Sequence, residues 1–169
     1  MKHGRPRSLT AAQQFLNLRA DPNVPSKGIL RQGRITWVCN LRPTPLSRIY
    51  TVRIEYAQGG TPQVFVDQPD LVQLAGGRRL PHVYEQSPTR LCLYQPAYRE
   101  WHDGLLISRT ILQWAMLWLF FFEEWLVSDE WKGGGEHPQP GSEKQRPRQR
   151  GGRTVSECAS SNIQPVIYP

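Results

Sequence analysis

The chain lacks the features that mark a disulfide-stapled or structural zinc protein. Its three cysteines, Cys39, Cys92 and Cys158, are odd in number and include no Cys-x-x-Cys pair. A disulfide framework would use an even number, and a zinc site would use paired ligands, so neither is expected. No apolar segment follows the first five residues, and we therefore expect no signal peptide and a reducing, cytoplasmic setting in which a thiol stays free.

Long hydrophobic runs and phosphate-binding loops are also missing. The longest apolar stretch, residues 111–122, contains one polar residue and is closed by Glu123 and Glu124. A membrane-spanning helix needs about 20 residues, so this stretch predicts a core or interface helix and no membrane association. There is no Gly-rich phosphate loop, and the chain shows no zinc ligands, helix-turn-helix pattern or aromatic-basic interleaving. Nucleic-acid binding is therefore the least favoured function.

Composition divides the chain into one domain and two tails. The net charge is +7, and 15 prolines and 14 glycines accompany a hydrophobic fraction of only 38%, which indicates a compact core with disordered ends. We predict a flexible N-terminus over residues 1–7, one domain over residues 8–131, and a disordered basic Gly/Pro-rich tail over residues 132–169.

The order of predicted elements gives an α+β fold. A short N-terminal helix follows Ser8, a candidate cap, and ends before Pro22. Alternating apolar and polar residues then predict an antiparallel meander of three strands, at residues 35–40, 50–56 and 63–66. Residues 70–90 read as a long irregular segment, which is typical of a functional loop. A long helix over residues 105–127 follows, with large aromatic side chains spaced for packing on a sheet.

A cysteine at the end of the irregular segment lies in a recognisable pattern. Cys92 is flanked by Leu91 and Leu93 and follows His82 by ten residues. In ubiquitin-conjugating enzymes a His-Pro-Asn motif lies the same distance ahead of an Ile/Leu-Cys-Leu sequence, so the chain resembles that family. Further matches are Tyr50-x-Val52, Pro62-x-Val64-x-Val66 and Trp101.

The departures from that pattern point to a bacterial subgroup. Val83 and Tyr84 stand where the family has proline and asparagine. The variant segments are Leu80-Pro81-His82-Val83-Tyr84, Leu91-Cys92-Leu93-Tyr94, Trp125-Leu126 and Trp131-x-Gly133-Gly134-Gly135-Glu136-His137-Pro138. They resemble stand-alone conjugating-enzyme-like proteins of cyclic-oligonucleotide-based antiphage signalling (CBASS) operons. The resemblance implies that the cysteine is joined to the C-terminus of a partner nucleotidyltransferase, the cyclase, which is then transferred to a target amine to prime antiviral defence.

The resemblance implies roles for three residues. Cys92 is the candidate nucleophile of a cysteine-dependent acyl transferase, although alone it would read as a small buried hydrophobe. His82 either activates the thiol or holds the loop structurally. Tyr84 either donates a hydrogen bond to the oxyanion in place of asparagine, or the chemistry differs. No cofactor or metal is expected.

Other residues have competing interpretations. Cys39 alternates with apolar residues on a predicted strand and is expected in the core, whereas Cys158 falls in the tail. His102 and Asp103 either form a His–carboxylate pair that acts as a general base, or belong to a loop in which Asp103 or Ser108 caps the next helix.

Two further questions concern the whole protein. Because the chain has no phosphate loop, the acyl group must be activated elsewhere or exchanged from an existing bond. The alternative to an enzyme is a catalytically inactive adaptor of the same fold that binds the cyclase.

Overall fold

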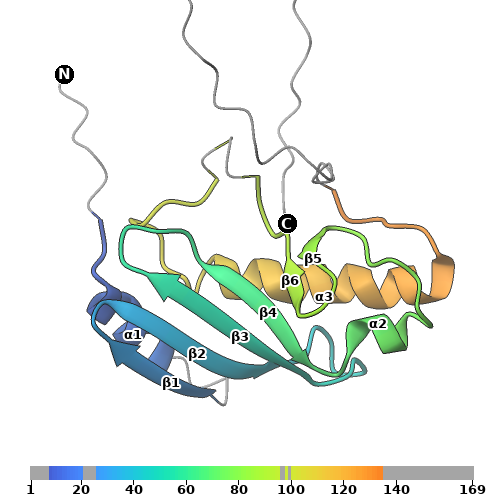
Figure 1. Ribbon diagram of the computed structural model, residues 1–169, viewed down its shortest axis with the longest axis horizontal. Coiled ribbons are helices and arrows are strands. Elements are labelled where there is room, and N and C mark those ends of the chain that lie inside the picture. The colour runs from blue at the N-terminus through green and yellow to red at the C-terminus, as the bar shows by residue number, and fades with distance from the viewer. Residues whose placement is uncertain (1–7, 21–25, 96–97, 99, 135–169) are drawn as a thin grey trace, which may run out of the picture. The chain divides into compact units, whose positions relative to one another are not determined.

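A computed structural model describes residues 8–20, 26–95, 98 and 100–134 of the chain. In these residues three helices accompany one six-stranded sheet with the strand order β1-β2-β3-β4-β6-β5 (Figure 1). The elements are α1 (Ala11–Arg19), β1 (Ser26–Arg31), β2 (Arg34–Leu41), β3 (Tyr50–Ala57), β4 (Gln63–Gln68), α2 (Leu71–Leu74), β5 (Val83–Glu85), β6 (Thr89–Leu91) and α3 (Ile111–Ser128). All neighbouring strands are antiparallel, and the predicted α+β class is confirmed.

The central strands follow the alternation of the sequence. On β2 the buried residues are every second one, and β3 alternates between buried and half-buried positions along its whole length. Trp37 pairs with Ile54 and Cys39 pairs with Val52, so the buried side chains of the two strands lie on the same face. A shift of one residue would turn this face outward, which is why the register is well determined.

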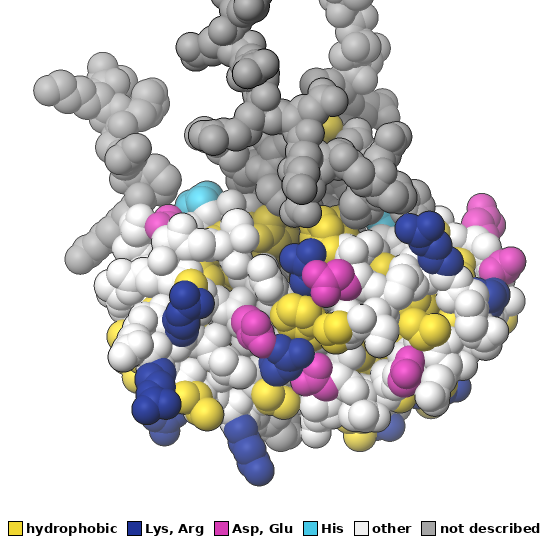
Figure 2. Space-filling view, in the orientation of Figure 1, with side chains coloured by type: hydrophobic (Ala, Val, Ile, Leu, Met, Phe, Trp, Pro, Cys, Tyr) yellow, Lys and Arg dark blue, Asp and Glu magenta, His cyan; other side chains and the backbone are white. Residues whose placement is uncertain are grey.

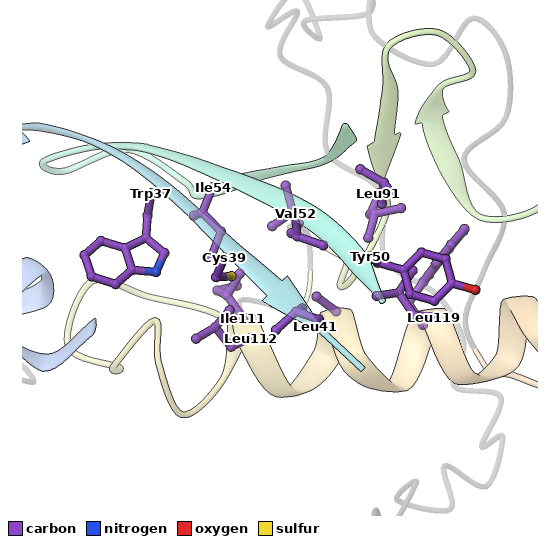
Figure 3. Packing of buried hydrophobic residues seen from close by; sticks show 14 of the residues in the cluster. Trp37, Cys39, Leu41, Tyr50, Val52, Ile54, Leu91, Ile111, Leu112 and Leu119 are labelled. Atoms are coloured by element: carbon purple, nitrogen blue, oxygen red, sulfur yellow. The ribbon is translucent and has the colours of Figure 1, made fainter. Parts of the chain in front are cut away.

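One face of the sheet is covered by α3, which runs lengthwise along it (Figure 1). In Figure 3 side chains of β2 and β3, including Cys39 and Val52, point toward Ile111, Leu112 and Leu119 of the helix. These residues belong to one buried cluster. The prediction that the aromatic helix packs on the sheet is therefore confirmed.

The long helix starts later than predicted, at residue 111 instead of 105. The buried side chain of Gln14 on α1 explains the difference. Its amide nitrogen donates to the Leu105 carbonyl at 2.7 Å, and its amide oxygen accepts from the Ile107 N–H at 3.0 Å. Backbone groups that a helix would have used are thus bound to α1, and residues 101–110 form a series of turns.

Several short elements were absent from the prediction. The segment at residues 70–90 is not irregular throughout, because it contains α2, β5 and the start of β6, each only three or four residues long. Such lengths show no measurable periodicity. The edge strand β1 was missed because residues 27–31 are all exposed, which leaves no alternation to detect.

The cap of α1 also differs from the prediction. Thr10, not Ser8, is the N-cap: its hydroxyl accepts from the Gln13 N–H at 3.2 Å, and the Gln13 side chain accepts from the Thr10 N–H at 2.9 Å. This reciprocal box requires glutamine three residues after the cap, whereas Ala11 follows Ser8 at that distance.

By length and composition α3, with 18 residues, could cross a membrane. The core helix of a soluble protein passes the same test, so this is weak evidence. Seven of its residues are buried in the protein. The expectation of a core helix therefore agrees with the packing.

Candidate active site

A small hairpin presents the predicted site residues. Strands β5 and β6 are joined by residues 86–88, and the hairpin pairs with β4 through Phe65–Arg90 and Val66–Thr89. Val83 pairs with Leu91 and Glu85 with Arg90, so Tyr84 is an additional residue that forms a β-bulge. Cys92 directly follows β6 and is partly exposed.

The hairpin is closed by side chain–backbone hydrogen bonds. The Gln86 amide exchanges two hydrogen bonds with the backbone of Leu80, at 2.9 Å and 3.1 Å. The Thr89 hydroxyl donates to the Gln86 carbonyl at 2.8 Å. These bonds fix a segment that is too short to be stable as an isolated two-stranded ladder.

His82 and Cys92 are brought together through the backbone. The His82 carbonyl accepts from the Cys92 N–H at 3.0 Å and from the Trp118 indole N–H of α3, also at 3.0 Å. His82 has a left-handed backbone conformation with φ of 47°. Its imidazole is only 5% exposed and stacks on Trp131, with ring centroids 4.9 Å apart. The ten-residue interval thus places the backbone of His82 beside that of Cys92.

Tyr84, Arg90 and Glu100 determine the electrostatics of the Cys92 thiol. Burial is the largest influence and raises the thiol pKa, and the charge of Glu100 raises it further. A hydrogen bond with the Tyr84 hydroxyl and the positive charge of Arg90 lower the pKa. The net result is a thiol pKa above its ordinary value, so the thiol is mainly protonated at neutral pH.

Tyr84 and Tyr94 both belong to the surroundings of the thiol. Burial and the hydrogen bond with Cys92 raise the pKa of Tyr84, so its hydroxyl keeps its proton and can donate it in a hydrogen bond. Burial also raises the pKa of Tyr94, a hydrogen bond with Thr61 lowers it, and Cys92 raises it. The Tyr94 ring rests against Trp114 of α3 at a centroid distance of 5.6 Å.

Comparison with known protein families identifies the chain. Residues 14–138 match the family model described as the type II CBASS E2 protein. The chain belongs to this family. Its place in CBASS antiphage signalling as an E2-like protein follows from that membership, and the resemblance stated from the sequence is confirmed. A search of the curated proteins found no match.

Three residues that influence the thiol of this CBASS E2 protein were not predicted from the sequence. Arg90 could have been found, because residues 90 and 92 point to the same side of an extended chain. Tyr94 and Glu100 lie in the loop after Cys92, where no period relates side chains to a common face. The Glu100 carboxylate accepts from the Gln95 N–H at 2.8 Å, an interaction that only the folded loop creates.

The other two cysteines of the CBASS E2 protein are Cys39 and Cys158. Cys39 is 2% exposed, and burial raises its thiol pKa to about 12, so its assignment to the core is confirmed. Cys158 lies outside the described residues. Within the described residues, no three His, Cys, Asp or Glu side chains gather closely enough to hold a metal ion.

His102 and Asp103 form part of a loop ahead of α3. The imidazole Nδ1 of His102 accepts from the Gly104 N–H at 3.1 Å, and the Asp103 carbonyl accepts from the Leu9 N–H at 2.9 Å. The N-cap of α3 is Thr110, which makes no side-chain cap hydrogen bond. The expectation that Asp103 or Ser108 caps the helix is therefore wrong, because turns bound to Gln14 separate both residues from it.

The visible surface of the CBASS E2 protein carries charges of both signs. On the face drawn in Figure 2, basic and acidic side chains lie interspersed among apolar ones. Ion pairs in the described residues include Arg53 with Asp67 at 2.9 Å and Arg90 with Glu85 at 3.0 Å. Such mixing produces no extended positive field on this face of the described residues.

Proposed function

We propose that this CBASS E2 protein is a cytoplasmic transferase that forms a thioester between Cys92 and the C-terminus of a partner nucleotidyltransferase. It then transfers that acyl group to a target amine, which primes the cyclase for antiviral defence. The observation that carries the proposal is a partly exposed thiol in a hydrogen bond with a protonated phenol. Membership in the type II CBASS E2 family supports it.

In the first half-reaction the Cys92 thiolate attacks the carbonyl carbon of the partner's C-terminal acyl group. A carbon–sulfur bond forms, and the group that activated the acyl carbon leaves with its electron pair. Negative charge moves from sulfur to the carbonyl oxygen during the attack. The Tyr84 hydroxyl, which first stabilises the thiolate, then becomes available to donate to the oxyanion.

In the second half-reaction the target amine attacks the thioester carbonyl. A carbon–nitrogen bond forms, the Cys92 thiolate leaves, and the amine proton passes to solvent. The Tyr84 hydroxyl donates to the oxyanion in this step as well. It takes the role that the resemblance assigns to asparagine in ubiquitin-conjugating enzymes.

In this mechanism His82 has a structural role. Its carbonyl accepts hydrogen bonds from Cys92 and from Trp118, and its imidazole is buried in a stack on Trp131. These contacts favour the structural role among the two that the sequence left open. They hold the backbone of the nucleophile against α3.

The raised pKa of Cys92 bears on activation. A mainly protonated thiol reacts slowly until the partner or a base removes its proton. The acyl group must also arrive activated by another protein or be exchanged from an existing bond. Both requirements make the partner complex the reactive species.

Coexpression with the neighbouring cyclase tests the function. We expect a band on a denaturing, non-reducing gel that disappears on reduction and is absent in Cys92→Ala. Cys92→Ser should give an adduct that survives reductant, because an oxygen ester resists thiols. Cys158→Ser is the matched control and should leave the adduct unchanged.

The same gels separate the enzyme from the adaptor. An adduct that persists in Cys92→Ala would overturn the thioester mechanism. A stable complex with the cyclase and no covalent adduct would favour a catalytically inactive adaptor. For His82→Ala, unchanged thermal stability with lost adduct formation would contradict the structural role assigned above.

A further inference from the structure

Arg90 lies directly against the phenol that bonds to the thiol. Its guanidinium carbon is 4.8 Å from the centroid of the Tyr84 ring, within the range of a cation–π contact. The two residues come from adjacent strands, Arg90 from β6 and Tyr84 from the bulge of β5. We propose that Arg90 is a positioning residue that holds the Tyr84 hydroxyl toward Cys92, an inference that rests on the proposed function.

Tyr84 needs such support because the backbone ladder gives it little. It is the additional residue of the bulge, with no cross-strand partner in the ladder, and it is 42% exposed. A half-exposed phenol on a three-residue strand would otherwise exchange between rotamers. A planar cation across its ring restricts that exchange without occupying the hydroxyl.

Arg90 is itself fixed. One terminal nitrogen bonds to the Glu85 carboxylate at 3.0 Å, and its side chain is mostly buried. Its Nε is buried without a hydrogen-bond partner. A buried donor without a partner lowers the stability of the hairpin. We attribute the presence of a guanidinium at this position to its contact with the Tyr84 ring.

The charge of Arg90 acts on the thiol in the same direction. The groups that interact electrostatically with Cys92 are Tyr84 from β5, Arg90 from β6, and Tyr94 and Glu100 from the loop that follows. The His82 imidazole is buried against Trp131, and the His82 carbonyl accepts from the Cys92 N–H. Among the described residues, Arg90 is the one cation that lowers the thiol pKa, opposing Glu100.

The competing interpretation is a cross-strand ion pair that only stabilises the hairpin. On that view, removing either charge of the Arg90–Glu85 pair should have the same consequences. The inference predicts instead that Glu85→Gln leaves the thiol nearly unaffected, because the guanidinium still lies on Tyr84. Arg90→Ala should affect the thiol strongly.

The test is the rate of Cys92 alkylation by iodoacetamide from pH 6 to 10, followed by mass spectrometry on the purified protein. For Arg90→Ala we expect the pH profile of alkylation to move to higher pH, and the rate at pH 7 to fall by about three- to tenfold. Arg90→Lys should restore part of the rate through charge. In a Tyr84→Phe background, Arg90→Ala should have a smaller effect, because its main route is gone.

Three results would overturn the inference: wild-type alkylation in Arg90→Ala, equal effects of Glu85→Gln and Arg90→Ala, or full additivity with Tyr84→Phe. If Arg90→Ala fails to fold, the comparison of Arg90→Lys with Glu85→Gln decides in the same way. Alkylation needs no partner. A normal Arg90 effect without any cyclase adduct would therefore overturn the proposed function and leave the positioning role standing.

Discussion

The middle of the sheet and the edge formed by β6 and β5 are held by different interactions. Strands β2 and β3 pair over eight consecutive residue pairs and bury every second side chain. Strands β5 and β6 pair at only two positions, with a bulge between them. There the conformation depends on side chain–backbone hydrogen bonds of Gln86, Thr89 and Trp118.

This difference separates stability from chemistry. The regular strands contribute apolar burial, which supplies most of the free energy of folding. The hairpin contributes fewer buried side chains, Thr89 and Leu91 among them, but it fixes a thiol, a phenol and a guanidinium relative to one another. Substitutions in the first region should therefore change the free energy of unfolding, and those in the second should change thiol reactivity.

The largest expected effect is a cavity in the regular region. Ile54→Ala removes a fully buried side chain of β3, and we expect it to lower the free energy of unfolding by about 2–5 kcal/mol in urea titration. Thr36→Ala, on the exposed face of β2, should change it by about 0.5 kcal/mol or less. A similar loss in both variants would contradict the assignment of the core.

Overpacking at the edge strand comes next. A Cβ on Gly28 would lie 2.1 Å from Cε3 of Trp37, so Gly28→Ala must displace the indole. We expect a loss of about 1–3 kcal/mol in the free energy of unfolding. Gly134→Ala, which has no atoms within 4 Å of its added Cβ, should be close to neutral. A neutral Gly28→Ala would show that the indole moves freely.

A smaller effect is expected at the junction of α3 and the hairpin. Trp118→Phe removes the N–H that donates to the His82 carbonyl, which should lower stability by about 1 kcal/mol. Hydrogen exchange at the Cys92 amide should accelerate by more than global stability explains. Trp114→Phe, for comparison, retains an aromatic contact with Tyr94 and should leave that amide protected. Equal protection of the Cys92 amide in both variants would show that the hydrogen bond from Trp118 to His82 does not hold this segment.

The smallest expected change concerns charge alone. Glu100→Gln removes a carboxylate that raises the pKa of Cys92, so the thiolate fraction at pH 7 should increase. Alkylation should be faster by about two- to threefold. The effect is small because salt partly screens a surface charge. Glu124→Gln, on the exposed side of α3, is the control and should alter nothing at Cys92. A slower reaction in Glu100→Gln would reverse the assigned sign.

The sequence predicts the regular region better than the hairpin, for physical reasons. In residues 50–56 apolar and polar side chains alternate regularly, and this alternation predicts both the strand and its buried face. The residues around Cys92 follow no period, and only a spacing shared with a known family drew attention to His82. The late start of α3 depends on Gln14, which binds backbone groups more than 90 residues away. Arg90 and Glu100 acquire their influence only once the loop is folded.

The bulge at Tyr84 has a consequence for how such a site can change over time. Residue 84 takes no part in the ladder, so the pairing of Val83 with Leu91 and of Glu85 with Arg90 does not use its backbone. Position 84 can therefore vary in chemical character without a matching change in the strands. Insertion or deletion of one residue would instead shift the register and alter which side chains lie beside the thiol. The chemistry of this site can therefore change by substitution at position 84 more easily than by a change in the length of the hairpin.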